Sequence, residues 1–219
     1  MDLMQKIVIW AIPVLFAITV HEASHGYAAR ALGDKTAESQ GRLSLNPIRH
    51  IDPVGTLLVP AVLLALGGFL FGWAKPVPVN PYRFAHPRRD MALVAVAGPL
   101  SNFGMAIFWA LLLKFSVVSA SGAQSWQMLL SQMAAAGIVI NLILMVLNLI
   151  PLPPLDGGRV LTGVVPEAVA QKLDRLERFG LLILLVLLMT GVLGTVLQPV
   201  LVWSQSVLLH ALGVPVSLF

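Results

Sequence analysis

The sequence has no cysteine and few charged residues. Of its 219 residues, 11% are charged and 58% are hydrophobic, and the mean hydropathy is +0.87. Because a soluble domain carries about 25% charged residues, this chain has too few to cover a water-facing surface. The lack of cysteine excludes a disulfide-rich secreted scaffold, and the apolar content excludes a disordered chain. A net charge of only +4 without a basic tract argues against nucleic-acid binding. The composition therefore indicates an integral membrane protein.

Apolar stretches long enough to cross a bilayer, which takes about 20 residues, recur along the chain. They predict an all-α polytopic membrane protein with about five to six transmembrane segments. The expected segments are residues 7–31, 54–73, 91–115, 128–150 and two that share 179–219, divided near Gln198 and Pro199. No internal repeat or long linker is visible, so residues 1–219 are expected to form one domain. The core of this domain is expected over about 5–160, and its C-terminal helices over about 179–219.

The basic residues predict the orientation of the chain. All but two of the 14 Lys and Arg residues lie in the stretches 30–49, 75–89 and 159–178. Since positively charged loops remain in the cytoplasm, these stretches are expected inside and the N-terminus outside. The chain would then sit in a membrane that is most simply the prokaryotic cell (inner) membrane.

The segment 54–73 has basic residues on both flanks, so a single crossing conflicts with the charge rule. Pro60 and the Gly67–Gly68 pair interrupt it, and residues 69–79 alternate and contain prolines. We therefore expect a re-entrant helix/β element between the first and second core helices, which returns as an extended edge. An ordinary spanning helix is the alternative.

A motif of chemical interest lies at the end of the first apolar run, where His21, Glu22 and His25 form H-E-x-x-H. Residues four apart share a helix face, so both imidazoles can reach one metal ion. Glu22 lies beside that face, where it can act as acid and base toward a water molecule. Ionisable groups are costly inside a bilayer and indicate function there. The alternative is a polar helix end hydrated at the membrane interface.

Catalytic zinc usually has three protein ligands, so one ligand has to come from elsewhere. His50 and His86 lie in basic stretches and are expected to be solvated, and His210 is expected to pack in an apolar segment. Apart from Glu22 of the motif itself, every acid other than Asp2 and Asp156 falls in a stretch assigned to the cytoplasm. Asp156 follows three prolines and precedes two glycines, which predicts an unwound end of the fourth segment that presents its carboxylate. The alternative for Asp156 is a simple helix-ending turn.

Three motifs together resemble the site-2 protease family of intramembrane zinc metalloproteases. They are H-E-x-x-H at 21–25, Gly-Pro-Leu-Ser-Asn at 98–102, and Asn148-x-x-Pro151 followed by Leu-Asp-Gly at 155–157. The resemblance implies that His21, His25 and Asp156 bind one zinc ion and that Glu22 is the acid/base. It also implies that Asn148 binds the substrate or the developing oxyanion. For Asn102 it implies a place in the core, with a packing or hydrogen-bonding role as plausible as a catalytic one.

The resulting hypothesis is an intramembrane zinc endopeptidase that hydrolyses peptide bonds in or near transmembrane segments during regulated intramembrane proteolysis. Its partners would be transmembrane protein substrates and the lipid bilayer, with the active site toward the cytoplasm. No PDZ-like domain fits between residues 115 and 128, and no CBS-type extension follows the core, so this would be a minimal form. The alternatives are a membrane transporter of divalent metal and a non-proteolytic protein that binds membrane helices.

Overall fold

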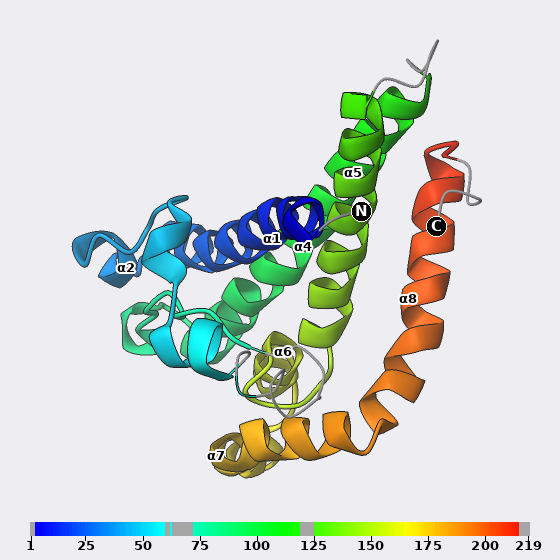
Figure 1. Ribbon diagram of the computed structural model, residues 1–219. Helices are drawn as coiled ribbons and strands as arrows, with labels where there is room; N and C mark the ends of the chain where they lie inside the picture. Colours follow the sequence, from blue (N-terminus) through cyan, green and yellow to red (C-terminus); the bar gives the residue numbers. More distant parts are fainter. Residues whose placement is uncertain (1–2, 60–61, 63–71, 119–124, 215–219) are drawn as a thin grey trace.

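The computed structural model describes residues 3–59, 62, 72–118 and 125–214, and Figure 1 shows their helices in sequence order. Over these residues every regular element is helical, which confirms the predicted all-α class. The long helices are α1 (Leu3–Ala31), α4 (Pro87–Val118), α5 (Ser125–Asn148), α7 (Glu167–Met189) and α8 (Val192–Ala211). The shorter elements are α2 (Thr36–Ser39), η1 (Pro47–His50), η2 (Pro53–Leu58), η3 (Pro81–Arg83) and α6 (Asp156–Val164).

Four helices in the described part of the chain are long and apolar enough to cross a membrane. They cover Met4–Ala31, Pro87–Ser116, Trp126–Asn148 and Val192–Ala211. The expected count was five to six, and α7 accounts for part of the difference. Only its residues 179–189 are free of charge, and they extend about 16 Å, roughly half the thickness of a bilayer core.

The predicted division near Gln198 and Pro199 is wrong. The break lies at Gly191, whose φ of +76° ends α7 in a left-handed conformation that suits glycine. Pro199 instead lies inside α8, where it is exposed. A membrane helix tolerates such a proline because other groups can satisfy the freed backbone carbonyl.

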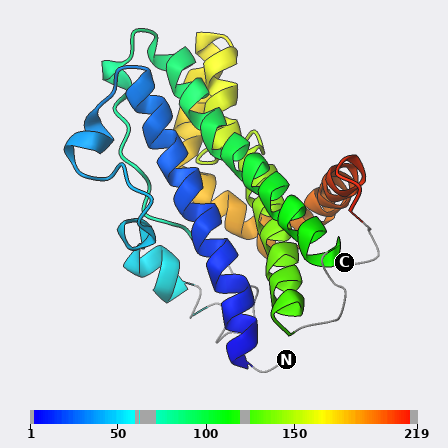
Figure 2. The same cartoon turned by 90° about the horizontal axis from the view of Figure 1, so that it is seen from above.

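The core of the fold is formed by α1, α4 and α5, which contact one another pairwise. In Figure 2, α1 and α5 run in the same direction and α4 runs opposite to them. Trp109 and Leu113 of α4 pack with Ile138 and Leu142 of α5, and the end of α8 joins this cluster through Leu209. The connections from α1 to α4 and from α5 to α7 therefore lie at the same end of the bundle.

The two ends of the expected re-entrant segment lie side by side. The Trp73 backbone N–H donates to the Gly55 carbonyl at 3.0 Å, and the Thr56 hydroxyl donates to the Trp73 carbonyl at 2.9 Å. A single crossing would instead separate these ends by about 30 Å, so the contact favours re-entry. Most of the expected segment lies outside the described residues, as do residues 69–71 of the expected extended edge. Residues 72–80 are non-helical and form no strand within the described chain.

Asp34 fastens residues 72–80 to the end of α1. Its side chain is 1% exposed, and its carboxylate accepts from the backbone N–H groups of Thr36 at 2.9 Å and Asn80 at 2.6 Å. Burial raises the pKa of this carboxyl, but the hydrogen bonds from Asn80 and Thr36 outweigh it and lower the pKa below its ordinary value. The segment thereby runs back along α1 toward the H-E-x-x-H turn.

Candidate active site

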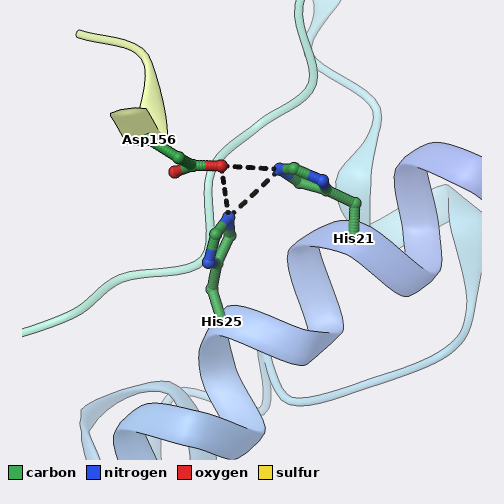
Figure 3. Close-up of side chains that lie close together, drawn as sticks. All are labelled: His21, His25 and Asp156. Carbon is green, nitrogen blue, oxygen red and sulfur yellow. Dashed lines mark hydrogen bonds and ion pairs between the residues drawn. The ribbon is translucent and has the colours of Figure 1, made fainter. Parts of the chain in front are cut away.

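His21, His25 and Asp156 come together between α1 and the start of α6, as Figure 3 shows. His21 and His25 are one turn apart on α1, and their Nε2 atoms are 3.1 Å apart. Asp156 Oδ2 lies 3.2 Å from the Nε2 of His21 and 3.3 Å from that of His25. All three residues are buried. The two histidines and the aspartate predicted from the sequence therefore form a single compact cluster.

The spacing of these three atoms fits a tetrahedral zinc site. Ligands about 2.0–2.1 Å from zinc at tetrahedral angles lie about 3.3 Å from one another, close to the three distances of this cluster. Asp156 Oδ2 is buried and accepts no hydrogen bond, although both imidazoles are next to it. A cation would satisfy that atom. Two imidazoles and a carboxylate are also ligand types that zinc takes in catalytic sites.

The chain unwinds before Asp156, as the prolines and glycines predicted. Helix α5 ends at Asn148, residues 149–155 form turns, and Asp156 is the first residue of α6. Helix α7 supports these turns from outside, because a side chain at Gly180 would overlap the Pro153 carbonyl. The carboxylate is thus aimed at α1 by a short loop that α7 supports.

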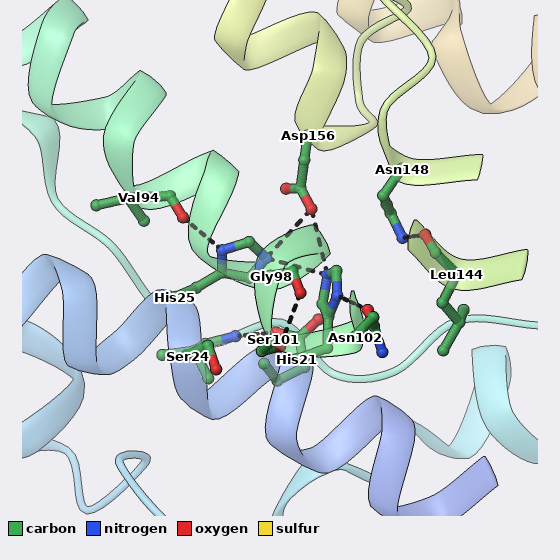
Figure 4. Close-up of polar contacts among 12 residues, drawn as sticks. His21, Ser24, His25, Val94, Gly98, Ser101, Asn102, Leu144, Asn148 and Asp156 are labelled. Carbon is green, nitrogen blue, oxygen red and sulfur yellow. Dashed lines mark hydrogen bonds and ion pairs between the residues drawn. The ribbon is translucent and has the colours of Figure 1, made fainter. Parts of the chain in front are cut away.

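Helix α4 lies directly against the two imidazoles. A Cβ atom at Gly98 would lie 2.5 Å from the Cε1 atoms of both His21 and His25, which is far too close. The His25 Nδ1 lies 2.8 Å from the carbonyl oxygen of Val94, also on α4. Because a carbonyl only accepts hydrogen bonds, His25 Nδ1 carries the proton and Nε2 presents its lone pair to the cluster. Figure 4 shows these contacts.

Glu22 is half-buried beside the cluster. Its Oε2 accepts a hydrogen bond from the Val77 backbone N–H at 2.9 Å. The non-helical segment 72–80 thus orients the carboxylate predicted to act as acid and base.

Asn148 is half-buried at the end of α5, and its amide donates to the Leu144 carbonyl at 2.9 Å. In Figure 4 it lies to one side of Asp156, and no contact recorded for the described residues joins it to the three clustered side chains. The structure therefore brings Asn148 near the site but not into it.

Asn102 and Asn141 form a buried polar connection behind His21, and both have no exposed surface. His21 Nδ1 lies 2.6 Å from Asn102 Oδ1, and the Asn102 amide donates to Asn141 Oδ1 at 2.9 Å. Sequence reasoning left the role of Asn102 open and missed Asn141. The signal that could have identified Asn141 is its position as an uncharged polar residue in the middle of an apolar segment.

The expectation for His50 is wrong, whereas His86 is exposed as predicted. His50 is 2% exposed, and its Nε2 lies 2.8 Å from the Ser44 carbonyl oxygen. The reason is that η1 folds against α1, so the ring lines a small cavity with Leu15 and Thr19.

H-E-x-x-H on a helix that can span a membrane, with a buried carboxylate completing the donor set, is typical of a membrane zinc metalloprotease. Comparisons with known proteins agree. Residues 114–191 match the family model described as Peptidase family M50. The chain is 41% identical over 191 residues to "Putative zinc metalloprotease YwhC" of Bacillus subtilis, covering 87% of this chain and 84% of that protein.

Two mycobacterial relatives are both named "Putative zinc metalloprotease Rip2". The Mycolicibacterium smegmatis protein is 29% identical over 180 residues, and the Mycobacterium tuberculosis H37Rv protein is 31% identical over 186 residues. In each case 82% of this chain is aligned, against 66% of the relative. No solved structure matches the chain. The chain belongs to peptidase family M50, and this membership disfavours the metal-transport and non-proteolytic alternatives.

Proposed function

We propose that this protein is an intramembrane endopeptidase that hydrolyses peptide bonds in or near the transmembrane segments of other membrane proteins, as in regulated intramembrane proteolysis. The observation that carries the proposal is the location of the His21, His25 and Asp156 cluster. It is buried among helices long and apolar enough to cross a bilayer. This location favours a peptide bond from a chain in the same membrane.

In this proposal His21, His25 and Asp156 hold one zinc ion through Nε2, Nε2 and Oδ2. Zinc bound there supplies Lewis-acid activation of water and of the scissile carbonyl. Glu22 accepts the proton of the attacking water and delivers it to the leaving amine nitrogen. The Val77 N–H keeps one Glu22 oxygen fixed during this transfer. Asn148 would rotate its amide from Leu144 toward the oxyanion that develops on the carbonyl oxygen.

An apolar cavity of about 160 Å³ supports a membrane-embedded substrate. Residues from one face of α1 line it together with Leu45 and Pro47. Its polar lining is minimal, and it reaches Thr19 and Val20, next to His21. An apolar substrate side chain would bury its surface there at about 25 cal/mol per Å².

The proposal also includes the orientation of the protein in the membrane. The basic stretches 30–49, 75–89 and 159–178 would face the cytoplasm of a prokaryotic cell, with the N-terminus outside and residues 1–219 forming one protease domain. The site would then open toward the cytoplasm. A reporter fused at Tyr82, which is 94% exposed, tests this. An external signal would contradict the orientation.

The substitution Glu22→Gln tests the chemistry. Glutamine keeps the size of the side chain and can still accept from Val77, but it takes up no proton. We expect the variant to retain zinc, to lose cleavage of co-expressed tagged membrane proteins by at least about 100-fold, and to trap substrates.

Glu38→Gln is the matched control, because Glu38 forms an exposed ion pair with Arg30 at 3.2 Å, away from the cluster. This control should cleave normally. Full activity of Glu22→Gln would refute the proposed role of Glu22.

A further inference from the structure

The polar connection behind His21 has a fixed direction, because it ends on backbone carbonyls that can only accept. The Asn141 side chain donates its amide to the Gly137 carbonyl at 2.8 Å. Its Oδ1 therefore faces Asn102 and accepts from the Asn102 amide at 2.9 Å. The same Asn102 nitrogen also reaches the Ala17 carbonyl at 3.3 Å. Reversing either amide would place two acceptors against each other.

This direction determines where the proton of His21 lies. With its nitrogen committed to Asn141 and Ala17, Asn102 can offer only Oδ1 to His21, at 2.6 Å from Nδ1. An amide oxygen accepts and does not donate, so Nδ1 of the neutral ring carries the proton. The Nε2 atom, which faces His25 and Asp156, is then left with a free lone pair.

We propose that Asn141 is a positioning residue for the metal site. Through Asn102 it holds His21 in the Nδ1–H tautomer and so makes Nε2 available as a ligand. Asn141 lies in a different helix from both histidines and reaches the site only through this connection. Without it, Asn102 can turn its amide nitrogen toward His21, which stabilises the tautomer with the proton on Nε2. The inference rests on the ligand role proposed above for His21.

The first test measures Zn²⁺ affinity of the full-length protein by competition with a chromophoric chelator. Loss of an outer-shell hydrogen bond lowers metal affinity about 10- to 100-fold, and we expect Asn141→Leu to fall in this range. If the leucine variant folds poorly, Asn141→Ala, which adds no bulk, replaces it and should show the same loss of Zn²⁺ affinity. Removing Asn141 from a protein that already carries Asn102→Leu should cost no further affinity, because the two residues act in series.

Leu142→Ala is the control for a purely structural effect. Leu142 is the neighbour of Asn141, is 2% exposed and lies in the α4–α5 core outside the hydrogen-bonded connection. This variant should unfold at a lower temperature yet keep its Zn²⁺ affinity within about threefold of the unchanged protein. An equal loss of affinity in Leu142→Ala and Asn141→Leu would overturn the inference, as would unchanged affinity in Asn141→Leu.

The second test reads the tautomer directly. In metal-free protein with ¹⁵N-labelled histidine, the nitrogen shifts of His21 should report a protonated Nδ1, and Asn141→Leu should lower the fraction of the ring that carries a proton on Nδ1. An unprotonated Nδ1 in the unchanged protein would refute the inference. His21→Ala separates the two proposals. If it keeps Zn²⁺, the ligand assignment fails; if it loses Zn²⁺ while Asn141→Leu does not, only the role of Asn141 fails.

Discussion

Replacing Gly98 with alanine adds one methyl group at the most crowded point of the site. The new Cβ would lie 2.5 Å from Cε1 of His21, 2.5 Å from Cε1 of His25 and 2.6 Å from Nε2 of His25. Carbon atoms in favourable contact are about 3.5–4.0 Å apart. The rings, or helix α4, must therefore move by about 1 Å.

A shift of this size in the imidazole rings is large enough to disrupt zinc binding. Metal–ligand distances in a working site agree with ideal values to within about 0.2 Å, so a ring displaced by about 1 Å no longer binds at the same point as its partners. A misplacement of about 1 Å can cost about 100-fold in rate, and overpacking costs about 1–3 kcal/mol of stability. We expect Gly98→Ala to lose at least about 10-fold in Zn²⁺ affinity and about 100-fold in cleavage.

The assay compares bound zinc and cleavage of a tagged membrane substrate with those of Gly104→Ala. Gly104 lies on the same helix, and a Cβ there meets no atom within 4 Å. Since alanine favours a helix over glycine by up to about 1 kcal/mol, the control should be at least as stable as the unchanged protein. Full zinc content and activity in Gly98→Ala would refute the packing argument for this glycine.

Three further predictions concern the ligand loop, the Asp34 contact and the core. Asp156→Ala should remove stoichiometric zinc while leaving the helical circular dichroism unchanged, and retained zinc would exclude Asp156 as a ligand. Asp34→Asn should destabilise the protein by about 1–3 kcal/mol at neutral pH, measured by thermal unfolding. Because the pKa of Asp34 is lower in the folded than in the unfolded state, its stabilising effect is present above the unfolded value of 3.8 and disappears as the pH falls through the folded value. The Asp34→Asn variant should therefore lose less stability than the unchanged protein on acidification to about pH 3, and an equal loss would contradict the assignment. Gly137→Ala should lower the unfolding temperature, since its Cβ would overlap the Trp109 ring, and an unchanged temperature would contradict the close packing of α4 on α5.

The sequence predicted those parts of the site that depend on local spacing or on rarity. Helical periodicity alone places His21 and His25 on one face, so their proximity follows from the motif. Asp156 was identifiable because few charges interrupt the apolar segments and because prolines and glycines surround it. Both inferences needed only short-range rules, and the structure brings the three residues within 3.3 Å of one another.

The features of the structure that the sequence did not predict depend mainly on contacts between distant segments. The buried position of His50 arises because η1 folds onto α1, and no local pattern marks that contact. Asn141 reaches Asn102, its side-chain partner, only once α4 and α5 are packed together. The end of α7 at Gly191 was missed because a proline eight residues later is the stronger helix-breaking signal in soluble proteins, whereas a membrane helix accommodates it.

His21 and His25 lie on α1, whereas Asp156 lies on α6, more than 120 residues later. The two parts of the metal site are therefore synthesised at different times. A nascent chain that has inserted only α1 already carries both histidines, but Asp156, 125 residues beyond the end of α1, has not yet been synthesised. The complete donor set forms only after α4 and α5 have inserted and the following loop has folded back onto α1. Capture of zinc is therefore coupled to the completion of folding, so an unfinished chain lacks the complete metal site.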